Sequence, residues 1–283
     1  MSTNTLCSLR PLKNFRFDHD CIHYIFMSKY LLILLVLIAL VDCTADPKLY
    51  QKIIHNTDPE AKCLDGSPGF VYVNEGGDTK NIMIYFLGGG MCGSTSKEAT
   101  LESCYQRSKD FLGSSKPWPA ILPNELAQGY LSTDPKVSPF ANWTKIFLPY
   151  CDGSLHQGYT KDPIKYKDAS LYFRGSLITR SHIAWIQSKY NLKGANKIIL
   201  TGMSAGGIAV NSWSNYVKDL VGDSKVFPIS DSGIFLNFQT QKGDWLLQEE
   251  IKNIVAVANG DELPPTKDCN RNNPGQEWKC LFI

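Results

Sequence analysis

The sequence has almost no excess of either charge. Across 283 residues, 29 Lys and Arg are balanced by 27 Asp and Glu, which gives a formal net charge of +2. This balance gives no indication of a nucleic-acid partner. Internal repeats, low-complexity runs, Cys-x-x-Cys pairs and histidine clusters are also missing, so the sequence contains no zinc-site pattern. The remaining composition, with 43% apolar residues, is that of an ordinary globular domain.

Long apolar runs are scarce as well. A membrane-spanning helix needs about 20 apolar residues, and the uninterrupted apolar run at 31–41 is much shorter. Lys29 precedes this run, and small residues at positions 43 and 45 follow it. A charged start, a short apolar stretch and a small-x-small end are typical of a secretory signal peptide.

This signal peptide is expected to occupy residues 1–45, or 27–45 if translation starts at Met27. Cleavage would then leave Asp46 as the first residue of a secreted protein. The alternative is an uncleaved signal anchor formed by residues 31–41, and only in that case do we expect contact with a membrane.

Six cysteines follow the predicted leader: Cys63, Cys92, Cys104, Cys151, Cys269 and Cys280. An even number in an exported chain indicates three disulfides, for which the sequence alone allows fifteen pairings. The same region contains one clear acceptor sequence for N-glycosylation, Asn142-Trp143-Thr144. We therefore predict an oxidised extracellular protein with Asn142 as a candidate glycan acceptor.

Apolar runs of strand length predict strands over residues 70–73, 81–87, 145–150, 197–201 and 226–230. Helical spacing predicts helices over 175–190 and 204–220. Residues 92–142 contain scattered Pro, Gly and Ser and are interpreted as short helices and surface loops. The alternation of strands and helices predicts one α/β domain over 46–283, with a mostly parallel sheet and helices on both faces.

The main chemical signal is the pentapeptide Gly202-Met203-Ser204-Ala205-Gly206, which matches Gly-x-Ser-x-Gly. It joins a predicted strand to a predicted helix, which is the elbow that a serine nucleophile requires. The two glycines remove side chains that would clash with the neighbouring strand and helix. Unpaired N–H groups at the helix start can bind an oxyanion. We therefore predict that Ser204 is a nucleophile, in a mechanism that requires no metal or cofactor.

A further oxyanion donor is predicted in Gly88-Gly89-Gly90, directly after the strand at 81–87. In such a site, one N–H belongs to the residue after the nucleophile and another to a loop after an earlier strand. Glycines in that loop let the backbone approach a substrate carbonyl closely. The alternative interpretation of the three glycines is a simple flexible turn.

The sequence has no histidine after Ser204, although the chain order of an α/β-hydrolase triad places the general base there. His156 follows a predicted strand and is a candidate base, whereas His182 lies within a predicted helix and is interpreted as a structural or surface residue. Asp231 is the best-placed acid. It is equally well explained as a turn residue in Ser230-Asp231-Ser232-Gly233.

Taken in order, several segments resemble the pectin acetylesterase and Notum family of secreted carboxylesterases. The matching segments cover residues 50–283 and are Cys63-Leu64-Asp65-Gly66-Ser67-Pro68, Phe86-Leu87-Gly88-Gly89-Gly90-Met91-Cys92, Asn142-Trp143, Tyr150-Cys151-Asp152-Gly153-Ser154, Leu171-Tyr172-Phe173-Arg174-Gly175, Ser204-Ala205-Gly206-Gly207, Ser230-Asp231-Ser232-Gly233 and Cys280-Leu281-Phe282. Together these short matches are far more specific than any one of them.

The resemblance implies an α/β-hydrolase fold and a Ser-Asp-His mechanism, in which Ser204 attacks an ester carbonyl and forms an acyl-enzyme. It implies an oxyanion hole made by the N–H groups of Gly89, Gly90 and Ala205. It also implies the disulfides Cys63–Cys151 and Cys92–Cys104, which leaves Cys269 to pair with Cys280.

The sequence departs from the family pattern in three places. Leu87 stands where the family usually has an acidic residue, and Met91 stands where plant members have Trp. The family also continues beyond its Cys-Leu-Phe segment and has its catalytic Asp and His in that later part, whereas this sequence ends at Ile283. We therefore expect a C-terminally truncated domain that lacks the last strands of its sheet and is inactive as these 283 residues.

The sequence is compatible with three candidate functions. The first is a secreted carboxylesterase that removes acetyl groups from a polysaccharide. The second is a Notum-like deacylase of an acylated protein. The third, which follows from the missing Asp and His, is a non-catalytic secreted protein that binds a glycan or an acyl group.

Overall fold

The computed structural model describes residues 49–222, 225–258 and 267–281. Contacts divide the chain into Met1–Ala45 and Asp46–Ile283, and every described residue belongs to the second unit. The predicted signal peptide and the alternative anchor at 31–41 therefore lie outside the described residues. Within the described ranges, no helix has both the length and the apolarity needed to cross a bilayer.

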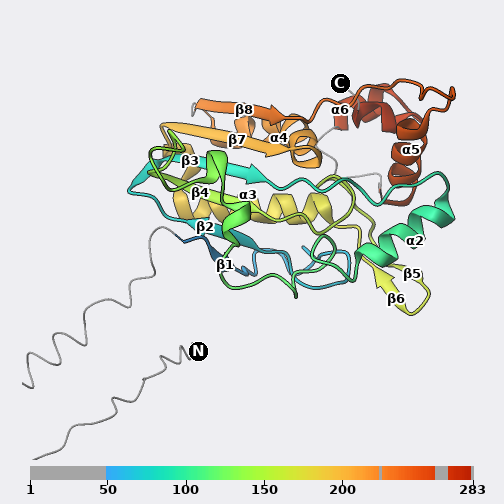
Figure 1. Ribbon diagram of the computed structural model, residues 1–283, viewed down its shortest axis with the longest axis horizontal. Coiled ribbons are helices and arrows are strands. Elements are labelled where there is room, and N and C mark those ends of the chain that lie inside the picture. Colours follow the sequence, from blue (N-terminus) through green and yellow to red (C-terminus); the bar gives the residue numbers. More distant parts are fainter. Residues whose placement is uncertain (1–48, 223–224, 259–266, 282–283) are drawn as a thin grey trace, which may run out of the picture. The chain divides into compact units, whose positions relative to one another are not determined.

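A six-stranded mixed sheet forms the centre of the second unit (Figure 1). Its spatial order is β1 (Gln51–Ile53), β2 (Val71–Asn74), β4 (Trp143–Leu148), β3 (Asp78–Phe86), β7 (Lys197–Met203) and β8 (Lys225–Asp231). The first two pairings in this order are antiparallel, and the last three are parallel. Each strand predicted from an apolar run is present, which confirms the mostly parallel α/β sheet.

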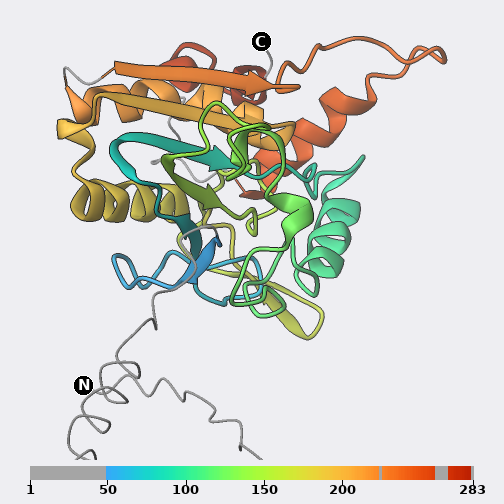
Figure 2. The same cartoon turned by 60° about the vertical axis from the view of Figure 1, so that its left-hand side comes forward.

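Two long helices cover one face of this sheet. The helices α3 (Gly175–Tyr190) and α4 (Ala205–Val221) match the predicted ones, and they lie on the same side of the strands in Figures 1 and 2. Ile186 of α3 and Trp213 of α4 share a buried core with Ile84 of β3. Because alternate residues of a strand point to opposite faces, this core contains every second side chain of the central strands.

The opposite face is covered mainly by the segment that leads into β4. Met83, next to Ile84 in β3, packs there with Trp118 and Leu122 in a second core. The described part of this covering segment contains the short 3-10 helices η1 (Asn124–Leu126) and η2 (Gly129–Leu131). This agrees with the short helices and loops predicted for that region.

The helix α2 (Lys97–Arg107) is longer than anything predicted between residues 92 and 142. Ser96 caps its start, because the Ser96 hydroxyl accepts a hydrogen bond from the Ala99 N–H at 3.2 Å. Few of its residues are buried, so its apolar spacing is weak, and the cap and the Cys104 disulfide define it instead.

A third core lies beyond the carboxyl ends of the parallel strands, where Figure 1 shows α2 beside α5. Leu101 of α2 and Ile254 of α5 pack there with Leu171 of a small hairpin. The remaining elements in this part of the chain are β5 (Ile164–Tyr166), β6 (Ala169–Leu171), η3 (Leu192–Gly194), α5 (Leu246–Ala258), α6 (Lys267–Asn272) and η4 (Glu277–Leu281).

Three disulfides join these parts, and their pairings are those expected above: Cys63–Cys151, Cys92–Cys104 and Cys269–Cys280. The first closes a segment with a sequence separation of 88 residues and ties the loop before β2 to the turn after β4. The second ties α2 to the loop after β3. The loop before β2, the turn after β4 and the loop after β3 all lie at the edge of the sheet where the parallel strands have their carboxyl ends. This is the edge at which α/β proteins place their sites.

Candidate active site

Ser204 stands in the turn between β7 and α4, as the pentapeptide predicted. Its backbone angles are φ 57° and ψ −120°, a conformation that costs a residue with a side chain on the order of 1–3 kcal/mol. Ser204 is also the N-cap residue of α4, yet its hydroxyl makes no capping hydrogen bond. The side chain is partly exposed, so its Oγ is free to react.

The glycines on either side of Ser204 allow the elbow to press against β3. A Cβ on Gly206 would lie 2.1 Å from the carbonyl oxygen of Phe86, and one on Gly202 would lie 2.6 Å from the same atom. Real Cβ atoms do not approach backbone oxygens so closely, so neither position accommodates a side chain. The elbow and the last residue of β3 are therefore in direct backbone contact.

The loop after β3 lies against the same elbow. A Cβ on Gly88 would meet the carbonyl oxygen of Met203 at 2.3 Å and the Cβ of Ser204 at 3.2 Å. Gly89 and Gly90 are exposed and have φ values of 140° and 66°. Among the described residues, no hydrogen-bond acceptor is assigned to the N–H groups of Gly89, Gly90 and Ala205. The predicted oxyanion donors therefore lie on two adjoining segments, and none of them is paired with another described residue.

Asp231 ends β8 beside the elbow. Its carbonyl oxygen accepts a hydrogen bond from the Ser204 N–H at 2.8 Å. Its carboxylate accepts one from the Ser232 hydroxyl at 3.0 Å, which is a contact between side chains. The carboxylate also helps to raise the pKa of Tyr85, after the larger effect of burial. No histidine among the described residues is hydrogen-bonded to the Asp231 carboxylate.

His156 is buried and participates in packing rather than in a contact with Ser204. Its side chain stacks on Tyr150, with the ring centres 4.6 Å apart, and its Nε2 lies 2.9 Å from the carbonyl oxygen of Leu87. Burial lowers its pKa, and the nearby Asp152 carboxylate opposes that shift only in part. This environment does not favour the role of general base considered for His156. No ring nitrogen in the described part of the chain is hydrogen-bonded to Ser204.

His182, interpreted above as a structural or surface residue, is buried and forms a pair with His55. The Nδ1 of His182 lies 2.8 Å from the Nε2 of His55, whose ring stacks on Trp185. Burial and the neighbouring rings of His55 and His156 lower the pKa of His182 well below its ordinary value. Burial also lowers the pKa of His55 to about 4. Both rings are therefore neutral in the folded protein at neutral pH.

This pair is expected to make the protein less stable in acid. Below pH of about 6.5 the unfolded chain binds protons at both histidines, whereas the folded protein does not. Stability is then complete above that pH and falls by up to about 1.4 kcal/mol per pH unit for each histidine as the pH decreases toward 4.

Urea unfolding at pH 7.5, 6.0 and 5.0 measures this slope, and His182→Asn is expected to lower it by up to about 1.4 kcal/mol per pH unit, the contribution of one histidine. The carboxylates, His55 and His156 are present in both proteins, so the difference between the two slopes isolates the contribution of His182. Equal slopes would contradict the assignment.

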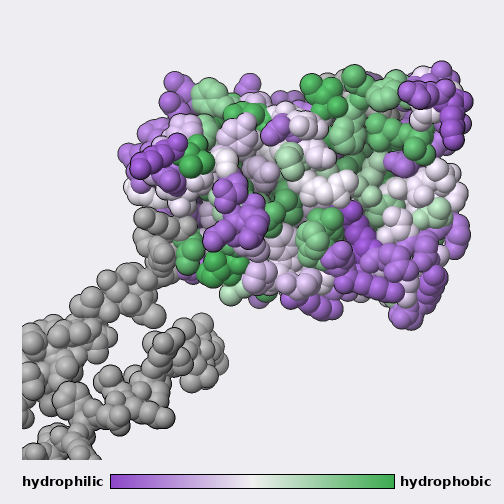
Figure 3. All heavy atoms as spheres, viewed as in Figure 1, coloured by the Kyte–Doolittle hydropathy of each residue, from purple (hydrophilic) through white to green (hydrophobic). Residues whose placement is uncertain are grey.

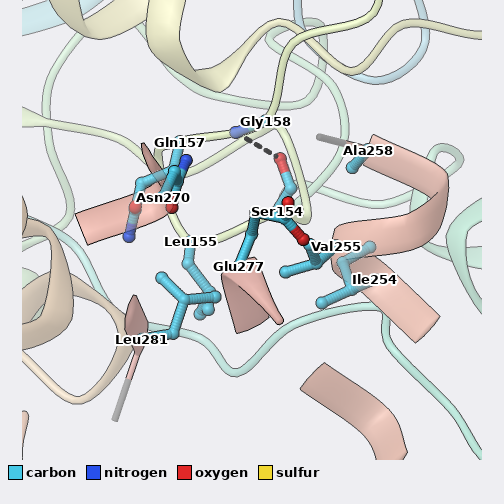
Figure 4. Close-up of a pocket in the computed structure, with 10 residues that line it drawn as sticks. All are labelled: Ser154, Leu155, Gln157, Gly158, Ile254, Val255, Ala258, Asn270, Glu277 and Leu281. Carbon is cyan, nitrogen blue, oxygen red and sulfur yellow. Dashed lines mark hydrogen bonds between the residues drawn. The ribbon is translucent and has the colours of Figure 1, made fainter. Parts of the chain in front are cut away.

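A small cavity lies between the turn after β4 and the elements α5 and η4. Figure 4 shows Gln157, Asn270 and Glu277 around it, with Leu281 and Ile254 providing apolar walls. Its volume is about 20 Å³, which holds about one water molecule. Ser204 is not part of its lining, so this cavity is not a substrate pocket of the elbow.

Two wider surfaces involve the chain that follows β8. An open depression of about 520 Å³ is lined by Thr95, Asp244, Trp245 and Glu249, among others. The other surface, called the apolar rim below, consists of Ile234, Leu236 and Phe238, whose exposed fractions are 63%, 58% and 66%. Figure 3 shows apolar residues gathered in this part of the molecule.

Asn142, the predicted glycan acceptor, lies exposed immediately before β4. Its side-chain oxygen accepts a hydrogen bond from the Gly77 N–H at 3.1 Å, which leaves the amide nitrogen directed away from that contact. Glycosylation at Asn142 stays a prediction.

No group of three or more His, Cys, Asp and Glu side chains within the described ranges is arranged to hold a metal ion.

A family model described as Pectinacetylesterase matches residues 44–283. Among individual proteins, pectin acetylesterase 5 of Arabidopsis thaliana is 34% identical over 227 residues, which is 78% of this chain and 50% of that protein. Palmitoleoyl-protein carboxylesterase notum1 of Xenopus laevis is 30% identical over 260 residues, which is 86% of this chain and 50% of that protein. The chain thus spans about half the length of these relatives.

The fold is similar to that of the Wnt deacylase Notum from Drosophila. The TM-score is 0.71, at 24% sequence identity, and the match covers 83% of this chain and 66% of the Notum chain. This similarity confirms the α/β-hydrolase fold expected from the sequence.

Proposed function

This chain belongs to the pectinacetylesterase family, and we propose that it is a secreted serine carboxylesterase that removes acetyl groups from a polysaccharide. The main support for the proposal is the strained Ser204 between β7 and α4, whose hydroxyl makes no capping bond and whose neighbouring N–H groups at Gly89, Gly90 and Ala205 have no hydrogen-bond acceptor within the described ranges. Strain of this kind is retained where the surrounding structure holds a functional residue in place.

In the proposed reaction, the Ser204 Oγ attacks the carbonyl carbon of the acetyl ester. The N–H groups of Gly89, Gly90 and Ala205 bind the oxygen that becomes negatively charged, and the start of α4 adds its favourable dipole. Collapse of this intermediate releases the sugar hydroxyl and leaves an acetyl-serine, which water hydrolyses to acetate. No described histidine is hydrogen-bonded to Ser204, so the proposal assigns the general base to none of them.

The open depression favours a polysaccharide substrate. It is wide rather than enclosed, and the indole of Trp245, 40% exposed, lies beside the polar side chains of Thr95, Asp244 and Glu249. An exposed aromatic side chain with neighbouring polar groups suits a sugar ring, which has an apolar face and hydroxyls at its edge. We therefore propose that this depression, whose lining does not include Ser204, binds a part of the sugar chain away from the reacting ester.

The apolar rim supports a second candidate, a deacylase of a lipid-modified protein. Ile234, Leu236 and Phe238 follow Gly233, whose backbone is in close contact with the first turn of α4 at Gly207. Exposed apolar area of this kind can bind an acyl chain. The third candidate, a protein that binds such ligands without turning them over, keeps the same surfaces and needs no general base.

Secretion is part of the proposal. It is supported by the apolar run at 31–41, by three disulfides within the described residues and by the family to which the chain belongs. A secreted protein whose first residue is Asp46 would agree with it, whereas a retained N-terminus in a membrane fraction would indicate the anchored alternative.

The test incubates the full-length protein with acetylated homogalacturonan and, separately, with an O-palmitoleoyl-serine peptide. Acetate is measured by NMR and deacylated peptide by mass spectrometry. Acetate release at the higher rate would support the first candidate, and faster peptide deacylation would support the second. Binding of either compound without release of acetate or acyl group would contradict esterase activity and favour the binding protein.

A further inference from the structure

We propose that Arg107, the last residue of α2, is a positioning residue of the oxyanion hole. It holds the carbonyl of Gly89 and thereby directs the N–H of Gly90 toward the reacting ester. This inference rests on the proposed esterase function, because it assigns a task to a residue that does not itself touch the substrate.

The guanidinium of Arg107 reaches the oxyanion loop directly. Its Nη2 donates a hydrogen bond to the Gly89 carbonyl oxygen at 2.8 Å, and its Nε donates one to the Leu112 carbonyl oxygen at 3.2 Å. The same group lies over the ring of Tyr150, 4.7 Å from its centre. A planar guanidinium can satisfy all three contacts at once, whereas a lysine ammonium cannot reproduce that fork.

The peptide bond transmits this contact to the predicted donor. The carbonyl of Gly89 and the N–H of Gly90 belong to one peptide unit, and no cis peptide bond occurs among the described residues. In a trans unit the two groups point in opposite directions. When Arg107 fixes the carbonyl on one side, it also fixes the N–H on the other side, and a cationic partner polarises the unit further.

The loop needs such a contact because glycines do not define a peptide orientation by themselves. Gly89 and Gly90 are both exposed with positive φ, and glycine adopts several backbone conformations at similar energy. The side chains of Leu112 and Tyr150 lie close to Gly89, since a Cβ there would be 2.8 Å from the Leu112 Cδ2 and 3.4 Å from the Tyr150 Cδ1. One Arg107 hydrogen bond holds the Gly89 carbonyl, and the other holds the backbone of Leu112, which packs against the same residue.

The support beneath Arg107 is rigid. Its helix is tied to the loop by the Cys92–Cys104 disulfide, and the Cys92 N–H bonds the Gly153 carbonyl oxygen at 2.9 Å. Tyr150 is buried, and its hydroxyl accepts the Leu155 N–H at 2.9 Å. Arg107 therefore connects this scaffold to the carbonyl of Gly89. That is the arrangement required of a preorganised electrostatic site.

The test replaces Arg107 by Met or by Lys in the full-length protein and follows hydrolysis of p-nitrophenyl acetate. Loss of an oxyanion donor typically lowers kcat by 10²–10³, and misdirection of one donor is expected to lower it by about 10- to 100-fold in R107M. KM is expected to stay within about twofold, because the contact acts on the developing charge. R107K keeps one hydrogen bond and is expected to recover part of kcat.

The Gly90 amide provides a readout that does not depend on turnover. In protein labelled with ¹⁵N-glycine, the Gly90 signal is expected to move and to exchange faster with solvent in R107M. Arg180 is the matched control, since its guanidinium also lies over aromatic rings, 5.2 Å from the ring centre of Tyr216, but on the helix-covered face. R180M is expected to leave kcat and the Gly90 signal unchanged.

Each result has one meaning. If R107M leaves kcat and the Gly90 amide as they were, or lowers only the melting temperature, Arg107 is not a positioning residue. If R107M does not fold, R107K and its Gly90 signal decide the question. If the unaltered protein hydrolyses no ester while its Gly90 amide still depends on Arg107, the proposed esterase function fails and the positioning contact stands.

Discussion

Replacement of Ser204 by alanine is expected to abolish ester hydrolysis, with a fall in kcat of at least about 10⁴-fold for any ester that the full-length protein turns over. The hydroxyl is the atom that forms the acyl-enzyme, so its removal leaves only the oxyanion donors and substrate binding. The Ser204 hydroxyl makes no capping hydrogen bond in the folded protein. The free energy of unfolding should therefore change by less than about 1 kcal/mol.

Ser214 provides a matched control on the same helix. Its hydroxyl bonds the Asn211 carbonyl oxygen at 3.4 Å and has no contact with the elbow. Ser214→Ala should retain full activity, measured as acetate release and as p-nitrophenol production. Equal activity of S204A and S214A would show that a different residue forms the acyl-enzyme.

Removal of the Cys63–Cys151 disulfide is expected to have the largest effect on stability. A crosslink over 88 residues restricts the unfolded chain by an entropy equivalent to about 4–5 kcal/mol at 25 °C. Domains of this type have a total stability on the order of 5–15 kcal/mol, so most of it would be lost. The double variant Cys63→Ala with Cys151→Ala should show this loss in urea unfolding under non-reducing conditions.

The disulfide with the short loop provides the comparison. Cys269 and Cys280 are separated by 11 residues, for which the same relation gives about 3 kcal/mol. Their double alanine variant should therefore unfold at a higher urea concentration than the first variant. The opposite order would mean that unfolded-chain entropy does not govern these crosslinks.

Local patterns predicted the parts of the site that neighbouring residues define. The elbow at Ser204 was predictable because a glycine pair, a preceding apolar strand and a following helix are all contained within residues 197–220. The close approach of the loop after β3 to this elbow was predictable because three glycines directly follow a buried strand, and its role as an oxyanion hole stays a prediction. In both cases the physical requirement is close backbone approach, and glycine is the residue that permits it.

Contacts between distant residues gave no comparable signal. His55 and His182 are 127 residues apart, and no pattern in either neighbourhood indicates that their rings meet. Arg107 lies 18 residues from Gly89, at the end of a helix whose few buried residues left it unpredicted. His156 was considered as a base because it follows a strand. Its burial against Tyr150 depends on the disulfide-linked turn, and the sequence alone does not specify that packing.

Covalent labelling of the full-length protein with a fluorophosphonate tests the central claim most directly, because the reagent reacts with an activated serine supported by an oxyanion hole. The predicted result is one adduct per chain, located on Ser204 by peptide mass spectrometry, absent from S204A and slowed in R107M. An adduct on another serine, or none on Ser204 in protein that hydrolyses esters, would contradict the account.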